Sequence, residues 1–289
     1  MKSIISLLSK LKRKDKNFNK YLRRNSTLSE SKIVQLSYDF QSGDYIKKYN
    51  PEIERKNLTP MINEINKTTN VKTLLDFGAG ELTRFSYLLK KLFKNDIKFF
   101  ACDISFNRLF LGSQLLGKKK LLNSSINIFC NDYFKLPFLD NSIDVIVTHH
   151  SIEPNKNNAK KIINELYRVA RKKLILQEPN YDIACKSGKK RMLNNNYVVD
   201  LNKILKKNGF RFEIIKSKFN LNDLNPASLY VIKKNTRMKK NCEFICNESK
   251  KNLSQVKNFY FSNETGTVYP ILNNITIFNK NFIFIKESI

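Results

Sequence analysis

The chain has 289 residues, of which 41% are hydrophobic, and this is enough for one full domain and a smaller one around a buried core. Its five cysteines are scattered, which argues against a disulfide-rich secreted scaffold and favours a reducing, cytoplasmic environment. No run of about 18 apolar residues occurs, so the sequence predicts no membrane span.

The formal net charge of +28 raises the question of nucleic-acid binding. Lysine supplies most of this charge, with 42 lysines against 11 arginines. Abundant Lys, Asn and Ile are typical of codon bias in an AT-rich genome, and arginine is the better bidentate ligand of phosphates. The composition therefore favours an acidic small-molecule substrate, with nucleic acid as the alternative.

The first 34 residues are predicted to be a basic leader. Residues 1–24 carry nine Lys or Arg against one Asp. A solvated leader is favoured over an amphipathic helix on an anionic membrane or partner. A cleaved signal peptide is disfavoured, because the apolar region is short, interrupted by serines and followed by charges.

Aromatic and acidic side chains gather in residues 35–50, ahead of the first predicted strand. Packing of Tyr38, Phe40 and Tyr45 in the core is the simpler role for these aromatics. Residues 51–67 are then predicted to form a helix that leads into the strand.

Residues 73–84, TLLDFGAGELTR, predict a strand, a glycine-rich loop and a helix. Gly78 and Gly80 allow the backbone to approach a ligand closely, and the loop ends at a helix N-terminus. Thr83 stands where a dinucleotide fingerprint requires its last small residue, and the chain has no phosphate-binding P-loop. Asp76 ends this strand, and Asp103 ends a second one over residues 97–102, where it is well placed to accept hydrogen bonds from ribose hydroxyls.

This ordered set resembles the class I S-adenosylmethionine-dependent methyltransferases, whose first motif reads hhD-h-G-x-G and whose next strand closes with an acidic residue. The resemblance implies an α/β, Rossmann-like sheet of seven strands over residues 70–234. It also implies that S-adenosyl-L-methionine is the cofactor, bound by Asp76, Gly78, Gly80 and Asp103. In this family a segment before the first strand covers the cofactor, which gives residues 35–50 a second possible role.

A third strand is predicted over residues 126–130, after a helix that Ser105 caps. The residues that follow it, up to KLPFLDNSID, resemble the same family. By that resemblance Asp132 lies near the adenine amino group and Tyr133 near the ring face. The alternative is that Asp132 occupies an ordinary surface turn.

The fourth strand, residues 143–148, runs into HHSIEPN, which contains the only two histidines of the chain. Ligands bind at the carboxyl ends of such strands, and imidazole is the natural base for a hydroxyl that loses its proton. His149, His150 and Glu153 are therefore the catalytic candidates. Two alternatives remain: both histidines are structural, or methyl transfer proceeds by alignment alone.

Helices are predicted over residues 157–171 and 197–207, and further strands over residues 174–177, 210–216 and 227–233. The strand at 174–177 ends in a second E-P-N sequence that begins with Glu178. Because neighbouring parallel strands end at the same edge of a sheet, we expect Glu153 and Glu178 to converge on one substrate pocket.

From Thr236 onward the sequence is β-rich and contains Cys242-x-x-x-Cys246. It resembles the small zinc-ribbon-like domains related to the activator subunit of RNA and protein methyltransferases, through Gly266, Tyr269, Pro270, Ile271 and Ile275. Structural zinc requires four Cys or His ligands, and none follows Cys246. The sequence therefore predicts a metal-free relic, with a site shared between subunits as the alternative.

The predicted domains are a leader over residues 1–34, a methyltransferase domain over residues 35–235 and a degenerate ribbon-like module over residues 236–289. The whole pattern is similar to that of bacterial methyltransferases associated with surface-sugar biosynthesis. The resemblance implies methylation of an oxygen, or a nitrogen, of an acidic or nucleotide-linked sugar. An RNA or protein methyltransferase with a built-in activator is the alternative.

Overall fold

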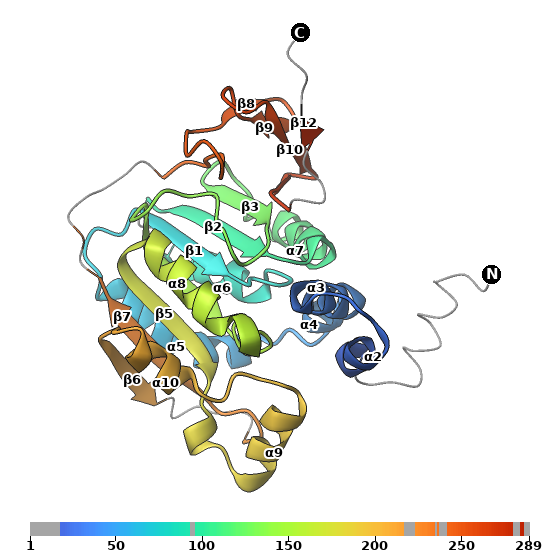
Figure 1. Cartoon of the computed structure of the whole chain (residues 1–289). Helices are drawn as coiled ribbons and strands as arrows, with labels where there is room; N and C mark the ends of the chain where they lie inside the picture. The colour runs from blue at the N-terminus through green and yellow to red at the C-terminus, as the bar shows by residue number, and fades with distance from the viewer. Residues whose placement is uncertain are drawn as a thin grey trace.

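The computed structural model describes residues 18–92, 96–216, 223–234, 236, 242–279 and 284–285 (Figure 1). Residues 1–17 of the predicted leader lie outside the described residues. The helices are α2 (Phe18–Asn25), α3 (Glu30–Phe40), α4 (Asp44–Lys47), α5 (Pro51–Asn66), α6 (Thr83–Leu92), α7 (Phe106–Lys118), η2 (Lys156–Asn158), α8 (Ala159–Val169), η3 (Tyr181–Ile183), α9 (Lys186–Asn194) and α10 (Leu201–Lys207). The strands are β1 (Thr73–Phe77), β2 (Lys98–Asp103), β3 (Ile126–Cys130), β4 (Ile143–His149), β5 (Ala170–Pro179), β6 (Phe212–Lys216), β7 (Ala227–Lys233), β8 (Ser254–Val256), β9 (Phe259–Phe261), β10 (Thr267–Leu272), β11 (Ile275–Ile277) and β12 (Phe284–Ile285).

The strands form one mixed sheet in the order β6-β7-β5-β4-β1-β2-β3-β11-β10-β9-β8, with β12 paired to β10. Strands β1 to β5 pair in parallel, and β7 runs antiparallel between β5 and β6. The protein therefore has an α/β fold, as predicted. The sheet is larger than the seven strands expected, because it continues past β3 into the C-terminal segment.

Helices cover both faces of the parallel part of the sheet (Figure 1). Leu74 of β1 joins a buried cluster with α5, α6 and α7, whereas its neighbour Leu75 joins a second cluster with α8 and α10. Alternate residues of a strand point to opposite faces, so a strand buried on both faces must be apolar throughout. This packing fixes the carboxyl ends of β1, β2, β4 and β5 along one edge.

The C-terminal segment is built into the main sheet rather than standing apart from it. β11 pairs in parallel with β3, in the register Ile275 to Ile128 and Ile277 to Cys130. Phe244 packs against Phe129 at a ring-centroid distance of 5.3 Å, inside one of the two buried clusters. The segment thereby covers the β3 edge, which would otherwise expose unpaired backbone groups.

Two turns of the C-terminal segment have the same backbone geometry. The first spans residues 246–250, with sequence CNESK, and the second spans residues 262–266, with sequence SNETG. In each turn the N–H of the first residue donates to the carbonyl five residues later, at 2.9 Å, and the N–H of the fifth donates back to the first carbonyl, at 3.0 and 2.9 Å. The fifth residue has a φ of 61° in one turn and 67° in the other. The two turns are thus structural repeats.

These repeated turns offer poor ligands for zinc. Cys246 Sγ lies 3.6 Å from Thr265 Oγ1 and contributes the only thiol to the two turns. Burial raises the pKa of this thiol, but hydrogen bonds led by the Ser249 backbone N–H outweigh burial and lower the pKa to about 6. Cys242 lies outside both turns, and hydroxyl side chains do not ligate structural zinc. The absence of metal remains a prediction.

Two features are absent from the described residues. No cluster of three or more His, Cys, Asp or Glu side chains there has the geometry to hold a metal ion. Nor does any helix in those ranges combine the length and hydrophobicity that crossing a bilayer requires.

Candidate active site

The loop after β1 is held against the end of β2. The N–H groups of Gly78 and Ala79 both donate to the carbonyl of Cys102, at 2.9 Å. Gly78 has a φ of +72°, and a Cβ atom there would lie 2.2 Å from Ser151 Cβ. Only glycine satisfies both conditions, so this close approach between the β1 and β4 loops explains the residue.

Asp103 fixes the second half of this loop. Its Oδ2 accepts a hydrogen bond from the Gly80 N–H and its Oδ1 accepts one from the Ser105 N–H, each at 2.9 Å. The carboxylate is buried and faces the cavity described next. The binding of ribose hydroxyls by Asp103 remains a prediction.

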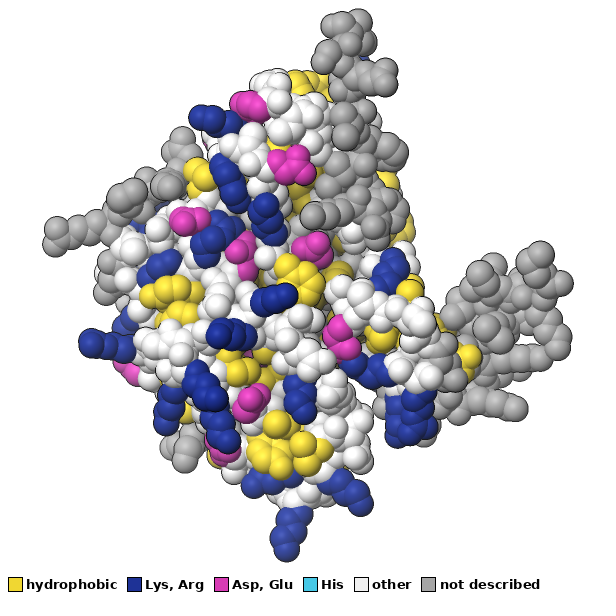
Figure 2. Space-filling view, in the orientation of Figure 1, with side chains coloured by type: hydrophobic (Ala, Val, Ile, Leu, Met, Phe, Trp, Pro, Cys, Tyr) yellow, Lys and Arg dark blue, Asp and Glu magenta, His cyan; other side chains and the backbone are white. Residues whose placement is uncertain are grey.

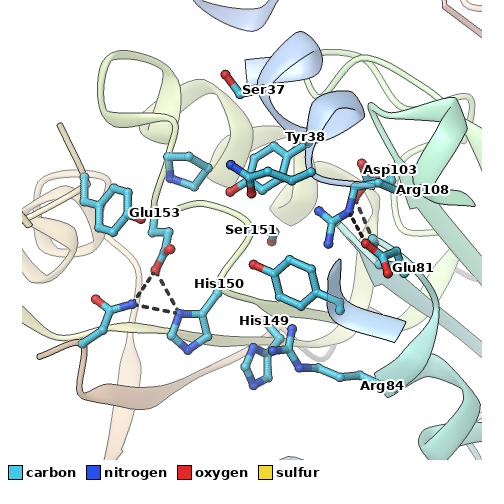
Figure 3. A pocket seen from close by; sticks show the side chains of 18 of the residues that line it. Ser37, Tyr38, Glu81, Arg84, Asp103, Arg108, His149, His150, Ser151 and Glu153 are labelled. Carbon is cyan, nitrogen blue, oxygen red and sulfur yellow. Dashed lines mark hydrogen bonds and ion pairs between the residues drawn. The ribbon is translucent and has the colours of Figure 1, made fainter. Parts of the chain in front are cut away.

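A cavity of about 510 Å³ opens over the carboxyl ends of the parallel strands (Figure 3). Seven of the predicted site residues line it, namely Gly78, Gly80, Asp103, Tyr133, His149, His150 and Glu153. A volume of this size lies within the range typical of small-molecule and cofactor sites.

Two predicted cofactor residues do not line the cavity. Asp76 is buried behind the loop, and burial raises its pKa to about 7. Asp132 Oδ1 accepts a hydrogen bond from the Phe134 N–H at 3.2 Å, as in an ordinary turn. The cofactor roles of both residues remain predictions, and the geometry of Asp132 is that of the surface-turn alternative.

Helices α2, α3 and α4 supply part of the cavity wall. Glu81, which follows the glycine loop, accepts hydrogen bonds from the N–H groups of Gly43 at 3.0 Å and Ile46 at 2.8 Å. Tyr38 and Tyr45 line the cavity, whereas Phe40 stacks on Phe18 with ring centroids 4.5 Å apart. Glu81 therefore attaches this segment to the predicted cofactor loop.

Residues of the predicted leader take part as well. Asn19 and Arg23, on α2, line the cavity together with Gln41. The proposed domain boundary at residue 34 therefore falls between residues that share one wall. That residues 1–17 form a separate leader remains a prediction, because the structure does not describe them.

His150 is the better placed of the two histidines to act as a base. Its Nδ1 lies 2.9 Å from Glu153 Oε2, and Asn225 Nδ2 donates to the same oxygen at 3.1 Å. When Nδ1–H donates to the carboxylate, Nε2 becomes a proton acceptor, and the carboxylate stabilises the imidazolium that forms. His150 has a φ of 55°, so the strand end turns sharply to present this ring. In Figure 3 the ring and Glu153 point toward each other at the cavity edge.

His149 has a different environment. Burial, the Arg84 charge and the His150 charge keep its pKa well below the usual range, so the ring is neutral. Both ring nitrogens are buried without a hydrogen-bond partner in the described structure, and the ring lies 4.6 Å from that of His150. His149 lines the cavity but lacks the carboxylate that orients His150.

Glu178 does not join Glu153 in the pocket, so the predicted convergence is wrong. Its Oε1 accepts hydrogen bonds from the Thr148 hydroxyl at 2.8 Å and from the N–H groups of Ser151 and Ile152, at 3.1 and 3.2 Å. Its Oε2 accepts one from the Glu153 N–H at 3.2 Å. Glu178 is fully buried, where burial raises its pKa to about 7, and it holds the loop that carries the histidines.

Sequence reasoning missed the arginines and amides of the cavity. Arg23, Arg84, Arg108 and Arg191 line it, as do Gln177, Asn195, Tyr197 and Asn225. Most of these residues lie outside the recognised motifs. Arg84 is the last residue of the glycine-loop segment, and Asn225 precedes a proline at the start of β7, which are weak signals at best.

Asp103→Ala is expected to weaken binding of S-adenosylhomocysteine by roughly 1–3 kcal/mol, since hydrogen bonds to a charged acceptor are lost. Calorimetric titration measures the affinity, and thermal unfolding of each variant reports any damage to the loop. Asp132→Ala serves as the comparison, because Asp132 does not line the cavity. Unchanged affinity in Asp103→Ala would remove the ribose assignment.

A family model matches the central region of the chain. Residues 75–176 match the family model described as a methyltransferase domain. No curated protein matches the chain.

Three solved structures share the fold. Magnesium protoporphyrin IX methyltransferase from Synechocystis PCC 6803, with bound S-adenosylmethionine, has 15% identity and a TM-score of 0.53 over 73% of this chain and 100% of its own. A chain from the complex between the Haloferax volcanii Trm112 methyltransferase activator and a methyltransferase has 13% identity and a TM-score of 0.51 over 69% of this chain and 98% of its own. The [4+2]-cyclase SpnF has 16% identity and a TM-score of 0.50 over 62% and 80%. At these identities the likeness shows the fold alone.

The matched residues 75–176 contain the glycine loop, Asp103, both histidines and Glu153, which all line or border the cavity described above. The protein is an enzyme that uses S-adenosyl-L-methionine, and it contains a class I S-adenosylmethionine-dependent methyltransferase domain.

Proposed function

We propose that the enzyme transfers a methyl group to an oxygen, or a nitrogen, of an acidic or nucleotide-linked sugar during cytoplasmic steps of surface-glycan biosynthesis. The observation that carries the proposal is the His150–Glu153 pair at the cavity edge, 2.9 Å apart. An imidazole oriented by a carboxylate suits the deprotonation of a hydroxyl group.

The cofactor, when bound, supplies an electrophilic methyl group on a sulfonium leaving group. His150 Nε2 would take the proton that the acceptor hydroxyl loses when it is methylated, while the carbon–sulfur bond of the methyl donor breaks and S-adenosylhomocysteine leaves with the electron pair. Glu153 holds the ring through Nδ1–H and balances the positive charge that develops on it. Asn225 keeps the carboxylate in place through its own hydrogen bond at 3.1 Å.

The remaining polar atoms of the cavity suit an acceptor rich in hydroxyl groups. Gln177 Oε1 and Asn225 Oδ1 are buried carbonyl oxygens without a hydrogen-bond partner among the described residues. Each is able to accept a hydrogen bond, and buried polar groups in proteins are normally satisfied. Sugar hydroxyls are donors of the required kind.

Two measurements test the proposal. Titration with S-adenosylhomocysteine is expected to show micromolar binding to the wild type and none to Gly78→Arg, whose side chain would fill the space beside Ser151. The wild type is then incubated with S-adenosylmethionine that carries a labelled methyl group, in separate reactions with nucleotide sugars, sugar acids and RNA. Label on a sugar supports the proposal. Label on RNA alone, or absence of cofactor binding, overturns it.

One observation favours the alternative of an RNA or protein methyltransferase with a built-in activator. The C-terminal segment pairs directly with the methyltransferase sheet through β11 and β3. A basic surface continuous with the cavity would strengthen this alternative. On the face that Figure 2 shows, Lys and Arg side chains are interrupted by acidic and apolar groups. The sugar acceptor is preferred because of the unpartnered Gln177 and Asn225 oxygens in the cavity.

A further inference from the structure

The charged residues of the cavity differ sharply from those of the chain as a whole. The sequence has 42 lysines and 11 arginines, yet among the described residues four arginines and no lysine line the cavity. Helix α9 shows the same choice locally, because Arg191 lines the cavity whereas Lys186, Lys189 and Lys190 of that helix do not. Lysine is the commoner cation of the chain, so composition alone does not explain why arginine is preferred in the cavity.

Three of the four arginines have a carboxylate partner. Arg23 pairs with Glu30, and Arg84 Nε lies 3.4 Å from Glu54 Oε2. Arg108 Nε lies 3.7 Å from Glu81 Oε1. These guanidinium charges are already balanced by the protein.

Arg191 is the exception. Within the described ranges no carboxylate forms an ion pair with it, and its Nη1 is buried without a hydrogen-bond partner. Its guanidinium carbon lies 5.5 Å from the centre of the Tyr197 ring, which supports the charge without neutralising it. A half-buried guanidinium group that lines a cavity and has a buried, unpartnered Nη1 is suited to bind an oxyanion.

The position of Arg191 places that anion on the acceptor side of the cavity. Tyr197, which Arg191 contacts, is followed by Val198, whose N–H donates to the Glu153 carbonyl at 2.9 Å. The Glu153 charge also contributes to the raised pKa of Tyr197, about 12, although burial is the larger cause. Arg191 is thus linked to Glu153 through Tyr197 and Val198, whereas Asp103 and the glycine loop belong to the predicted cofactor side.

We infer that Arg191 and Tyr197 form a subsite for an oxyanion, a carboxylate or a phosphate, carried by the acceptor whose hydroxyl lies at His150. The inference rests on the proposed function and adds to it the residues that recognise the negative charge of the acceptor. The planar guanidinium group binds two oxygens of such a group at once, which lysine does not do.

Calorimetric titration of the protein saturated with S-adenosylhomocysteine tests this subsite. The probes are uridine diphosphate glucose, glucuronate, uridine diphosphate glucuronate and the uncharged methyl glucoside. We expect at least one anionic probe to bind and the uncharged one not to bind. The anionic probe that binds distinguishes phosphate from carboxylate as the recognised group.

Arg191→Gln is expected to weaken binding of that anionic probe at least tenfold, with Arg191→Lys between this variant and the wild type. Arg55→Gln removes the same charge from an exposed position on α5 and is expected to bind like the wild type. All three variants are expected to keep the wild-type affinity for S-adenosylhomocysteine. Failure of the wild type to bind S-adenosylhomocysteine would count against the proposed function itself. Normal cofactor binding with no anionic probe bound, or with equal probe binding in Arg191→Gln, overturns the subsite.

Discussion

Replacing His150 with alanine is expected to lower kcat by about 10²- to 10⁴-fold, the range typical of a lost general base. Affinity for S-adenosylhomocysteine should stay near the wild-type value, because His150 acts on the acceptor rather than on the cofactor. Glu153→Gln removes the carboxylate at 2.9 Å from Nδ1 and should also slow turnover, by a smaller factor, since the base itself remains. The measurement is the single-turnover transfer of a labelled methyl group to the acceptor found by screening.

His149→Ala is the matched comparison for this series. His149 adjoins His150 in the chain and lines the same cavity, but it has no carboxylate partner. We expect its loss to affect kcat less than the loss of His150. A larger loss in His149→Ala would reverse the assignment, and normal turnover in both variants would mean that transfer proceeds by alignment alone.

The recognised motifs predicted the parts of this site that depend on local sequence. Glycines at 78 and 80, an acidic residue at the end of β2 and histidines at the end of β4 all occupy positions that the parallel sheet brings to one edge. Glu178 shows the limit of that reasoning. It lies at the same edge as Glu153, yet its carboxylate turns into the β4 loop and bonds three backbone N–H groups, a choice that strand spacing does not reveal.

The sequence did not predict the site residues that tertiary packing places at the cavity. Asn225 meets Glu153 from a position 72 residues later in the chain, and Arg191 enters the cavity from a helix whose other cations face elsewhere. The pairing of β11 with β3 joins residues almost 150 positions apart, and no local sequence pattern predicts it. Such contacts depend on packing of the whole chain rather than on periodicity.

The two C-terminal turns can be tested for the geometry of a zinc ribbon. Zinc-binding turns place two cysteines three residues apart, and here positions 246 and 249, and 262 and 265, have that spacing. Their backbones match, and the Cys246 thiol lies 3.6 Å from the Thr265 hydroxyl of the other turn. Cys246 thus occupies one of four positions with this spacing, and the other three carry hydroxyl groups at Ser249, Ser262 and Thr265.

Changing Ser249→Cys, Ser262→Cys and Thr265→Cys together is expected to create a zinc site that binds one ion per chain. Zinc binding stabilises the folded state of such sites by roughly 10–16 kcal/mol. The thermal unfolding midpoint of the variant should therefore rise when zinc is added and fall when a chelator is added. Metal analysis of the purified protein should find about one zinc per chain in this variant and substoichiometric zinc in the wild type. Adding Cys246→Ser should weaken the new site, whereas adding Cys242→Ser should not, because Cys242 lies outside both turns. A triple variant without zinc would contradict the idea that the turns retain ribbon geometry, and a wild type with one zinc per chain would contradict the prediction that the segment works without metal.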